Sequence, residues 1–132
     1  MAHEPAKSYQ ECLKKLQALI IADSFDSKFA PLENAKTPKC LFPIANVPNL
    51  HYVIEFLVMN EVKEIIIASS MHRIRIQQFL KAQAYKGVKI DVKGIKADSE
   101  SFGDALREVA DLQVLRDDFI VVRGDIITNI NI

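Results

Sequence analysis

The stretch LQALIIADSFDSKFAPL, residues 16–32, contains the change from a buried strand to a polar loop that decides how this chain folds. Apolar residues follow one another without alternation from Ala18 to Ala22, as they do in strands buried on both faces of a parallel sheet. The polar loop begins immediately afterwards, at Asp23. Because α/β folds bind ligands where such strands run into loops, the stretch also predicts the position of a candidate site.

Strand and helix patterns alternate along the rest of the chain. The expected strands are residues 17–22, 63–69, 88–94 and 118–122, and the expected helices begin near residues 49, 70 and 101. This alternation predicts an α/β, Rossmann-like fold in which a parallel sheet carries helices on both faces and the crossovers are right-handed. Residues 88–93 alternate between apolar and charged types, which indicates an edge strand with one wet face.

The helices are predicted from apolar spacing and from start signals. Their apolar positions are Leu50, Val53, Ile54 and Leu57 in the first, Ile76, Phe79 and Leu80 in the second, and Phe102, Ala105, Leu106 and Val109 in the third. Ser69 or Ser70 is expected to cap the second helix, and Ser101 with Asp104 forms a capping-box pattern for the third. The long, proline-containing loop before the first helix should pack residues 39–48 on the edge of the sheet.

Length and composition predict one domain of ordinary globular type. We expect a polar lead-in at residues 1–15 and the N-terminal part of a single domain at 16–132. Seventeen basic and seventeen acidic residues leave no net charge to hold nucleic acid or an anionic membrane. Neither a transmembrane run nor a signal peptide is evident, so a cytoplasmic protein is expected, with Cys12 and Cys40 as free thiols. His3, His51 and His72 share no metal-ligand spacing, so no zinc site is expected.

The loop after the first strand resembles the opening of sugar-nucleotide nucleotidyltransferases. In that family the strand ends in Ala-Gly-Gly-x-Gly-Thr-Arg-Leu-x-Pro, and a Pro-Lys pair follows. The positions that match this frame are Ala22, Phe29 and Pro31, with Lys28 in place of the arginine. The glycine positions are occupied by Asp23, Ser24 and Asp26, around Phe25.

These replacements remove what a phosphate loop needs. Glycines let backbone N–H groups approach phosphate oxygens and permit positive φ, which Asp and Ser do not. Each carboxylate would also repel a phosphate charge by about 1 kcal/mol at 4 Å in water, and by about 4 kcal/mol at an effective dielectric of 20. The loop is therefore expected to bind nucleoside triphosphate weakly or not at all.

Three further positions match functional residues of the family, and each has a simpler interpretation. The resemblance implies phosphate contact for Lys39, a place near the nucleobase for Gly103, and magnesium binding for Asp125. A solvated surface lysine, a helix cap supplied by Asp104 and a turn after the fourth strand explain these residues without a ligand. We therefore expect no catalytic residue, no metal and no cofactor.

The altered loop and the segment GDIITNINI, residues 124–132, give a more specific resemblance, to the nucleotidyltransferase-like subunits of eukaryotic translation initiation factor 2B. Among these, the gamma type retains more glycine in the loop, so the epsilon type fits better. The resemblance implies a guanine-nucleotide exchange factor whose exchange domain is a C-terminal helical repeat outside this sequence. It implies an assembly scaffold here, with the gamma and other subunits as partners and initiation factor 2 as a partner of the full-length subunit.

Two other functions stay open at this stage. An active sugar-phosphate nucleotidyltransferase would need the glycine loop. A regulatory module that binds a nucleotide or sugar phosphate would use the carboxyl edge of the sheet near Ser24, Phe25, Gly103 and Gly124. The family's domain continues beyond residue 132, so we expect a truncated domain that leaves apolar surface bare and self-associates. The residues expected to be bare are Ile126, Ile127, Ile130 and Ile132.

Overall fold

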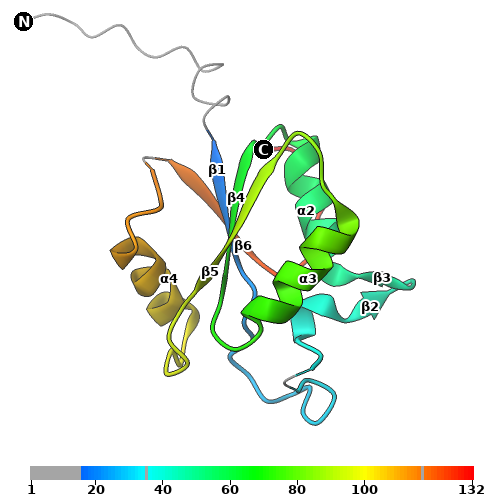
Figure 1. The fold of residues 1–132 in the computed structure, drawn as a ribbon, viewed down its shortest axis with the longest axis vertical. Helices are drawn as coiled ribbons and strands as arrows, with labels where there is room; N and C mark the ends of the chain where they lie inside the picture. Colours follow the sequence, from blue (N-terminus) through cyan, green and yellow to red (C-terminus); the bar gives the residue numbers. More distant parts are fainter. Residues whose placement is uncertain (1–15, 35, 117) are drawn as a thin grey trace, which may run out of the picture.

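A four-stranded parallel sheet forms the centre of the computed structural model, which describes residues 16–132 except 35 and 117. The expected lead-in at residues 1–15 lies outside the described residues. The sheet strands are β1 (Gln17–Ile21), β4 (Glu64–Ser69), β5 (Lys89–Gly94) and β6 (Phe119–Arg123). They lie side by side in the order β5-β4-β1-β6, so β1 pairs with β4 on one side and with β6 on the other (Figure 1).

Helices cover both faces of the sheet, which confirms the predicted α/β fold. The three helices are α2 (Asn49–Met59), α3 (Arg73–Gln83) and α4 (Phe102–Asp111). Figure 1 shows α2 and α3 on one side of the sheet and α4 on the other. None of the helices in the described part of the chain is long and apolar enough to cross a membrane.

Burial of β1 on both faces explains why the sequence stretch around it decides the fold. Ala18 and Ile20 pack into the core under α2 and α3, whereas Leu19 and Ile21 pack into the core under α4. Burying an Ile or Leu side chain contributes about 2 kcal/mol to folding, so both layers depend on this strand. Gln17, also buried, donates from Nε2 to the Val114 carbonyl at 2.9 Å and accepts from a backbone N–H, so its polar atoms have partners.

The segment between β1 and α2 differs from the expectation. It contains a 3-10 helix, η1 (Lys39–Leu41), and a short hairpin of β2 (Pro43–Ile44) and β3 (Val47–Pro48). Cys40 is buried in the core, as the apolar composition predicted, but the hairpin is largely exposed. Its turn places Ala45 and Asn46 at positive φ, and both residues of β2 are exposed, so packing of residues 39–48 on the sheet edge is wrong for the hairpin.

One of the two predicted helix caps is wrong and the other is confirmed. The N-cap of α3 is His72, not Ser69 or Ser70, because Ser69 lies at the end of β4. The Ser69 hydroxyl accepts from the His72 N–H at 3.3 Å and donates to the Asp23 carboxylate. At α4, Ser101 is the N-cap and its Oγ accepts from the Asp104 N–H at 3.2 Å.

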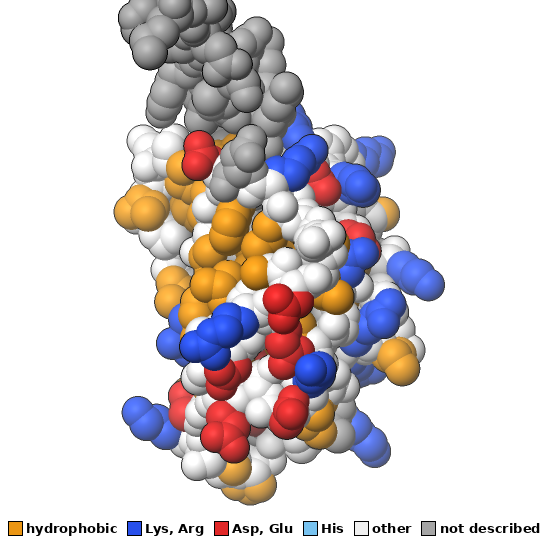
Figure 2. All heavy atoms as spheres, turned by 90° about the vertical axis from the view of Figure 1, so that its left-hand side faces the viewer, with side chains coloured by type: hydrophobic (Ala, Val, Ile, Leu, Met, Phe, Trp, Pro, Cys, Tyr) orange, Lys and Arg blue, Asp and Glu red, His pale blue; other side chains and the backbone are white. Residues whose placement is uncertain are grey.

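The two edges of the sheet differ in character. β5 alternates as predicted, with charged residues facing outward, and this protects an edge strand from pairing with other chains. β6 carries no charge before Arg123, and its Val121 side chain is 38% exposed. Figure 2 shows the side of the molecule on which α4 lies in Figure 1, where hydrophobic side chains gather in a patch above acidic and basic ones. The four isoleucines expected to be bare are exposed: Ile126, Ile127, Ile130 and Ile132.

Candidate functional site

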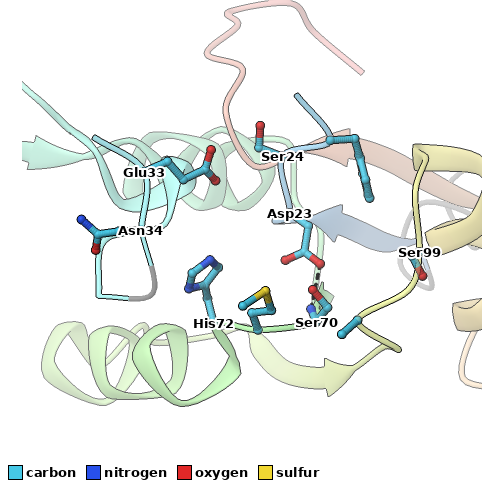
Figure 3. A pocket seen from close by; sticks show the side chains of 10 residues that line it. Asp23, Ser24, Glu33, Asn34, Ser70, His72 and Ser99 are labelled. Atoms are coloured by element: carbon cyan, nitrogen blue, oxygen red, sulfur yellow. Dashed lines mark hydrogen bonds between the residues drawn. The ribbon is translucent and has the colours of Figure 1, made fainter. Parts of the chain in front are cut away.

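A hollow of about 310 Å³ lies where β1 and β4 run into their loops, at the carboxyl edge of the sheet. Its lining residues come from four segments: Asp23, Ser24 and Phe25; Glu33 and Asn34; Ser70, Met71 and His72; and Ala97 with Ser99. Figure 3 shows the His72 ring between Asp23 on one side and Glu33 and Asn34 on the other. The position is the one that the end of the first strand predicted.

Asp23 joins the loop after β1 to the end of β4. Its Oδ1 accepts from the Ser69 hydroxyl at 2.8 Å. Its Oδ2 accepts from the Ser70 N–H at 2.8 Å (Figure 3). A carboxylate that accepts two hydrogen bonds is held firmly. The residue that replaces the first family glycine therefore forms an internal latch, while its negative charge stays at the wall of the hollow.

Lys39 and Asp125 form an ion pair across the loop, and both side chains are mostly buried. Lys39 Nζ lies 3.0 Å from Asp125 Oδ2 and 3.8 Å from Asp26 Oδ2, and these side chains of Lys39 and Asp125 are 14% and 15% exposed. The ammonium also lies 4.5 Å from the centre of the Phe29 ring, a cation–π contact. The interpretation of Lys39 as a solvated surface lysine is therefore wrong, because the long loop folds it back onto the end of β6.

Asp125 has a second cationic partner. Arg123 donates to both oxygens of this carboxylate, from Nε at 3.1 Å and from a terminal nitrogen at 3.0 Å. Burial by itself would raise the pKa of the Asp125 carboxyl, but the hydrogen bond from Lys39 and the charge of Arg123 outweigh it and hold the pKa below 3.8, its ordinary value. Asp125 therefore forms ion pairs with Lys39 and Arg123, in addition to lying in the turn after the fourth sheet strand.

The magnesium ion of the resembled family does not fit these residues. Magnesium requires near-octahedral oxygen ligands, and the Asp125 oxygens are already engaged with the two cationic side chains described above. Among the described residues no group of three His, Cys, Asp or Glu side chains is arranged to hold a metal ion. Lys39 instead places an internal positive charge between Asp26 and Asp125.

Gly124 lets β6 and η1 approach the end of β1 closely. A Cβ at this position would lie 3.1 Å from the Ala22 Cα and 3.1 Å from the Cys40 Cβ. The Gly124 N–H donates to the Ile21 carbonyl at 2.9 Å.

Cys40 lies beside Gly124 and is buried in the core. Burial raises the pKa of its thiol to about 12, and the negative charge of Asp23 raises this pKa further. The thiol is a packed core group, without the thiolate that nucleophilic cysteines need.

The structure brings together only part of the predicted site. Asp23, Ser24 and Phe25 line the hollow, whereas Gly103 belongs to α4 and Gly124 is buried against Ala22 and Cys40. Lys28 is exposed in the loop, and its N–H donates to Asp26 Oδ1 at 3.0 Å. These last three residues do not line the hollow.

Sequence reasoning placed three of the ten lining residues in the site and missed the other seven, among them His72, Glu33 and Asn34. His72 was assigned no role, yet its ring lies in the hollow and its Nδ1 is buried without a hydrogen-bond partner in the described structure. The sequence signal for it was its place directly after the second strand of the sheet. Glu33 and Asn34 lie within the long loop, where no periodic pattern predicts which side chains turn inward.

Comparisons with known proteins identify relatives for this arrangement. No protein-family model matches the chain. It is 36% identical over 123 residues to the translation initiation factor eIF2B subunit epsilon of Dictyostelium discoideum, covering 89% of this chain and 17% of that protein. It is 35% identical to the eIF2B subunit epsilon of Schizosaccharomyces pombe, covering 96% of this chain and 20% of that protein. It is 31% identical to the eIF2B subunit gamma of the same organism, covering 88% of this chain and 26% of that protein. The chain thus spans about a fifth of the length of the curated epsilon relatives.

Two solved structures of nucleotidyltransferases have the same fold as this chain. A glucose-1-phosphate thymidylyltransferase from Bacillus anthracis, crystallised with sucrose, matches with a TM-score of 0.71 at 22% identity and covers 83% of this chain and 44% of that one. A UDP-glucose pyrophosphorylase from Acinetobacter baumanii matches with a TM-score of 0.67 at 16% identity, over 86% of this chain and 46% of that one. At these identities the likeness concerns the fold alone, and the chain has a nucleotidyltransferase-like fold.

Proposed function

We propose that this chain, which is homologous over 89% to 96% of its length to the epsilon subunit of translation initiation factor eIF2B, acts in translation initiation as a non-catalytic assembly domain of such a subunit. One observation carries the proposal: the charged groups at the nucleotide-binding edge of the fold are engaged with one another. Lys39 pairs with Asp125, and Asp23 is tied to the end of β4.

Nucleotidyl transfer needs free groups at this edge. Catalysis of phosphoryl chemistry rests on positioning the phosphates and on cations that neutralise their developing charge. Here the Lys39 ammonium already neutralises Asp125. Binding a phosphate through Lys39 would leave a mostly buried carboxylate with Arg123 as its only cationic partner among the described residues. Separating such a pair costs about 1.5 to 3 kcal/mol before any phosphate contact is gained.

The charge of the hollow also opposes a triphosphate. Asp23 and Glu33 line it, and no lysine or arginine of the described part of the chain does. Each pair of like charges at 4 Å costs about 1 kcal/mol in water and about 4 kcal/mol at an effective dielectric of 20. This edge therefore supports a structural role better than nucleotide binding.

Assembly with other subunits is the role that remains for the domain. We infer that nucleotide exchange on initiation factor 2 resides outside residues 1–132, and that the gamma-type subunit is one binding partner. Exposed apolar side chains on the hairpin and on α2, Ile44 and Val58, are accessible for such a contact.

A binding experiment tests the assembly role. Ile44→Asp or Val58→Asp, introduced into a full-length epsilon subunit that contains this sequence, should reduce capture by its gamma partner at least tenfold. Leu112→Asp, at an exposed apolar position at the end of α4 and outside the hollow, serves as the control and should leave capture unchanged. Fluorescent GDP release from initiation factor 2 is measured in parallel with the 132-residue chain. Acceleration by this chain alone would overturn the assembly assignment.

A further inference from the structure

We propose that a second hollow, between the 36–41 segment and α3, binds a peptide segment of a partner protein in which an apolar side chain lies next to carboxylates. The hollow has a volume of about 360 Å³, which lies at the lower end of the range for specific binding pockets. We call it the Lys36–Arg75 groove, and its lining residues are Lys36, Thr37, Leu41, Pro48, Arg75, Gln78 and Phe79. The inference does not depend on the proposed function.

One face of α3 forms one wall of the groove. Arg75, Gln78 and Phe79 stand at i, i+3 and i+4 of the helix, so their side chains share a face. The opposite wall comes from η1 and from the end of β3, through Leu41 and Pro48. Because each wall belongs to a regular element, the groove is preformed, which reduces the entropy cost of binding.

The floor of the groove is apolar and anchored. Leu41 and Phe79 are partly buried and pack against the core under α2 and α3, so they cannot withdraw from the groove without disturbing that core. Ile74, one turn before Gln78 on the same helix, is 72% exposed and extends the apolar surface. An apolar side chain of a partner would gain about 25 cal/mol for each Å² of apolar surface removed from water here.

The rim of the groove is cationic. Lys36 and Arg75 are exposed, and neither has a carboxylate within salt-bridge distance among the residues that the structure describes. Within residues 16–132, leaving out 35 and 117, no aspartate or glutamate lines the groove. A guanidinium binds a carboxylate through two parallel hydrogen bonds, and the lysine ammonium adds a point charge.

A tight turn fixes the position of the lysine. The Asn34 Oδ1 accepts from the Lys36 N–H at 2.9 Å and from the Thr37 N–H at 3.1 Å. The backbones of Asn34 and Thr37 also exchange hydrogen bonds, at 3.3 and 3.1 Å. The side chain of Lys36 therefore projects from a defined backbone at the rim of the groove.

The two hollows carry opposite charges, which determines the kind of peptide segment that the groove attracts. Glu33 and Asn34 line the acidic hollow described above, whereas Lys36 and Thr37, from the same turn, line the groove. An acidic segment is repelled by the first hollow and attracted by the second, so complementarity of charge and of apolar surface both favour a carboxylate-flanked apolar peptide.

A titration followed by ¹⁵N NMR tests the inference on the 132-residue chain. The probe is acetyl-Glu-Leu-Phe-Asp-amide, compared with acetyl-Lys-Leu-Phe-Lys-amide and acetyl-Glu-Ser-Ser-Asp-amide. The first peptide should shift the amide signals of Lys36, Leu41, Arg75 and Phe79, and the other two should not. Arg75→Glu should raise the dissociation constant at least tenfold, as should Lys36→Glu. Lys81→Glu, an equal charge change on the same helix outside the groove, should alter it less than twofold.

Several outcomes would overturn the inference. The first is the absence of shifts with acetyl-Glu-Leu-Phe-Asp-amide up to about 1 mM, which corresponds to binding weaker than about −4 kcal/mol. The second is shifts of the same size with the peptide that lacks apolar side chains. The third is a rise in the dissociation constant with Lys81→Glu that equals the rise with Arg75→Glu. Shifts at Asp23 and His72 in place of the groove residues would overturn it as well. Thermal melting of each variant, unchanged within about 3 °C, guards against loss of folding.

Discussion

Replacing Lys39 by methionine should destabilise the chain by about 2 kcal/mol at pH 7. The change keeps the length of the side chain but removes the ammonium that pairs with Asp125 at 3.0 Å and lies on the Phe29 ring. Exposed ion pairs contribute about 0 to 1 kcal/mol, and loss of one partner of a fully buried pair costs about 3 to 5 kcal/mol. The expected value lies between these ranges, because both side chains are about one-seventh exposed and Arg123 still partners Asp125.

Urea denaturation measures this loss. With a slope of about 2 kcal/mol per M, the midpoint should fall by about 1 M. Lys28→Met is the matched control, since Lys28 is an exposed lysine of the same loop, and it should shift the midpoint by less than about 0.3 M. A double-mutant cycle with Asp125→Asn should give a coupling of about 1 to 2 kcal/mol between the two side chains.

The loss should depend on pH with a definite sign. The pKa of Asp125 is lowered in the folded chain, so the pair contributes stability above 3.8, the ordinary value, and the contribution disappears as the pH falls through the folded pKa. The difference between the original chain and Lys39→Met should therefore be complete at pH 7 and shrink below pH 3.8. A loss of under about 0.5 kcal/mol at pH 7, or a loss of equal size at the lowest pH, would refute the ion-pair reasoning.

Three further substitutions or reactions test other contacts, each by urea denaturation unless stated. Gly124→Ala should cost about 1 to 3 kcal/mol because the new Cβ would lie 3.1 Å from Ala22 Cα, whereas Gly103→Ala, with its nearest neighbour at 3.9 Å, should be neutral or slightly stabilising. Ser101→Ala should cost about 1 kcal/mol through loss of the α4 cap. Burial raises the pKa of Cys40 to about 12, so mass spectrometry after alkylation at pH 8 should find it labelled about 100-fold more slowly in the folded than in the unfolded chain.

The strands and helices could be predicted from the sequence because their patterns are local. The unbroken apolar run from Ala18 to Ala22 predicted a central strand, and β1 is central. The capping pattern at Ser101 predicted the start of α4 within one residue. The charge alternation that begins at Lys89 predicted an edge strand, and β5 lies at an edge. Period and propensity act over a few residues, so the sequence reports them directly.

The candidate site was predicted less well because its contacts are non-local. The ion pair joins Lys39 to Asp125, which the sequence separates by most of the chain, and only the parallel sheet brings η1 beside the end of β6. The latch between Asp23 and Ser69 likewise crosses from one strand end to the next. Lysines are mostly exposed in proteins, so Lys39 was interpreted as a surface residue. Nothing in the sequence around Lys39 indicates that its partner is Asp125, which follows the last strand.

Helix capping shows the same limit on a smaller scale. Ser69 and Ser70 are both residue types that favour an N-cap, yet the structure uses them to hold Asp23, and α3 begins later, after His72. A tertiary hydrogen bond to a carboxylate is stronger than a neutral cap bond, so the Ser69 hydroxyl donates to Asp23, and Ser70 contributes its backbone N–H.

Calorimetry with GTP or ATP in the presence of magnesium tests most directly the claim that the charged groups at the carboxyl edge are engaged with one another and unavailable to a nucleotide. The account predicts no binding tighter than about 10 μM, which corresponds to about −7 kcal/mol. Tighter binding of either nucleotide to the 132-residue chain, lost on Lys39→Met, would contradict it, because Lys39 would then serve the phosphates and not Asp125.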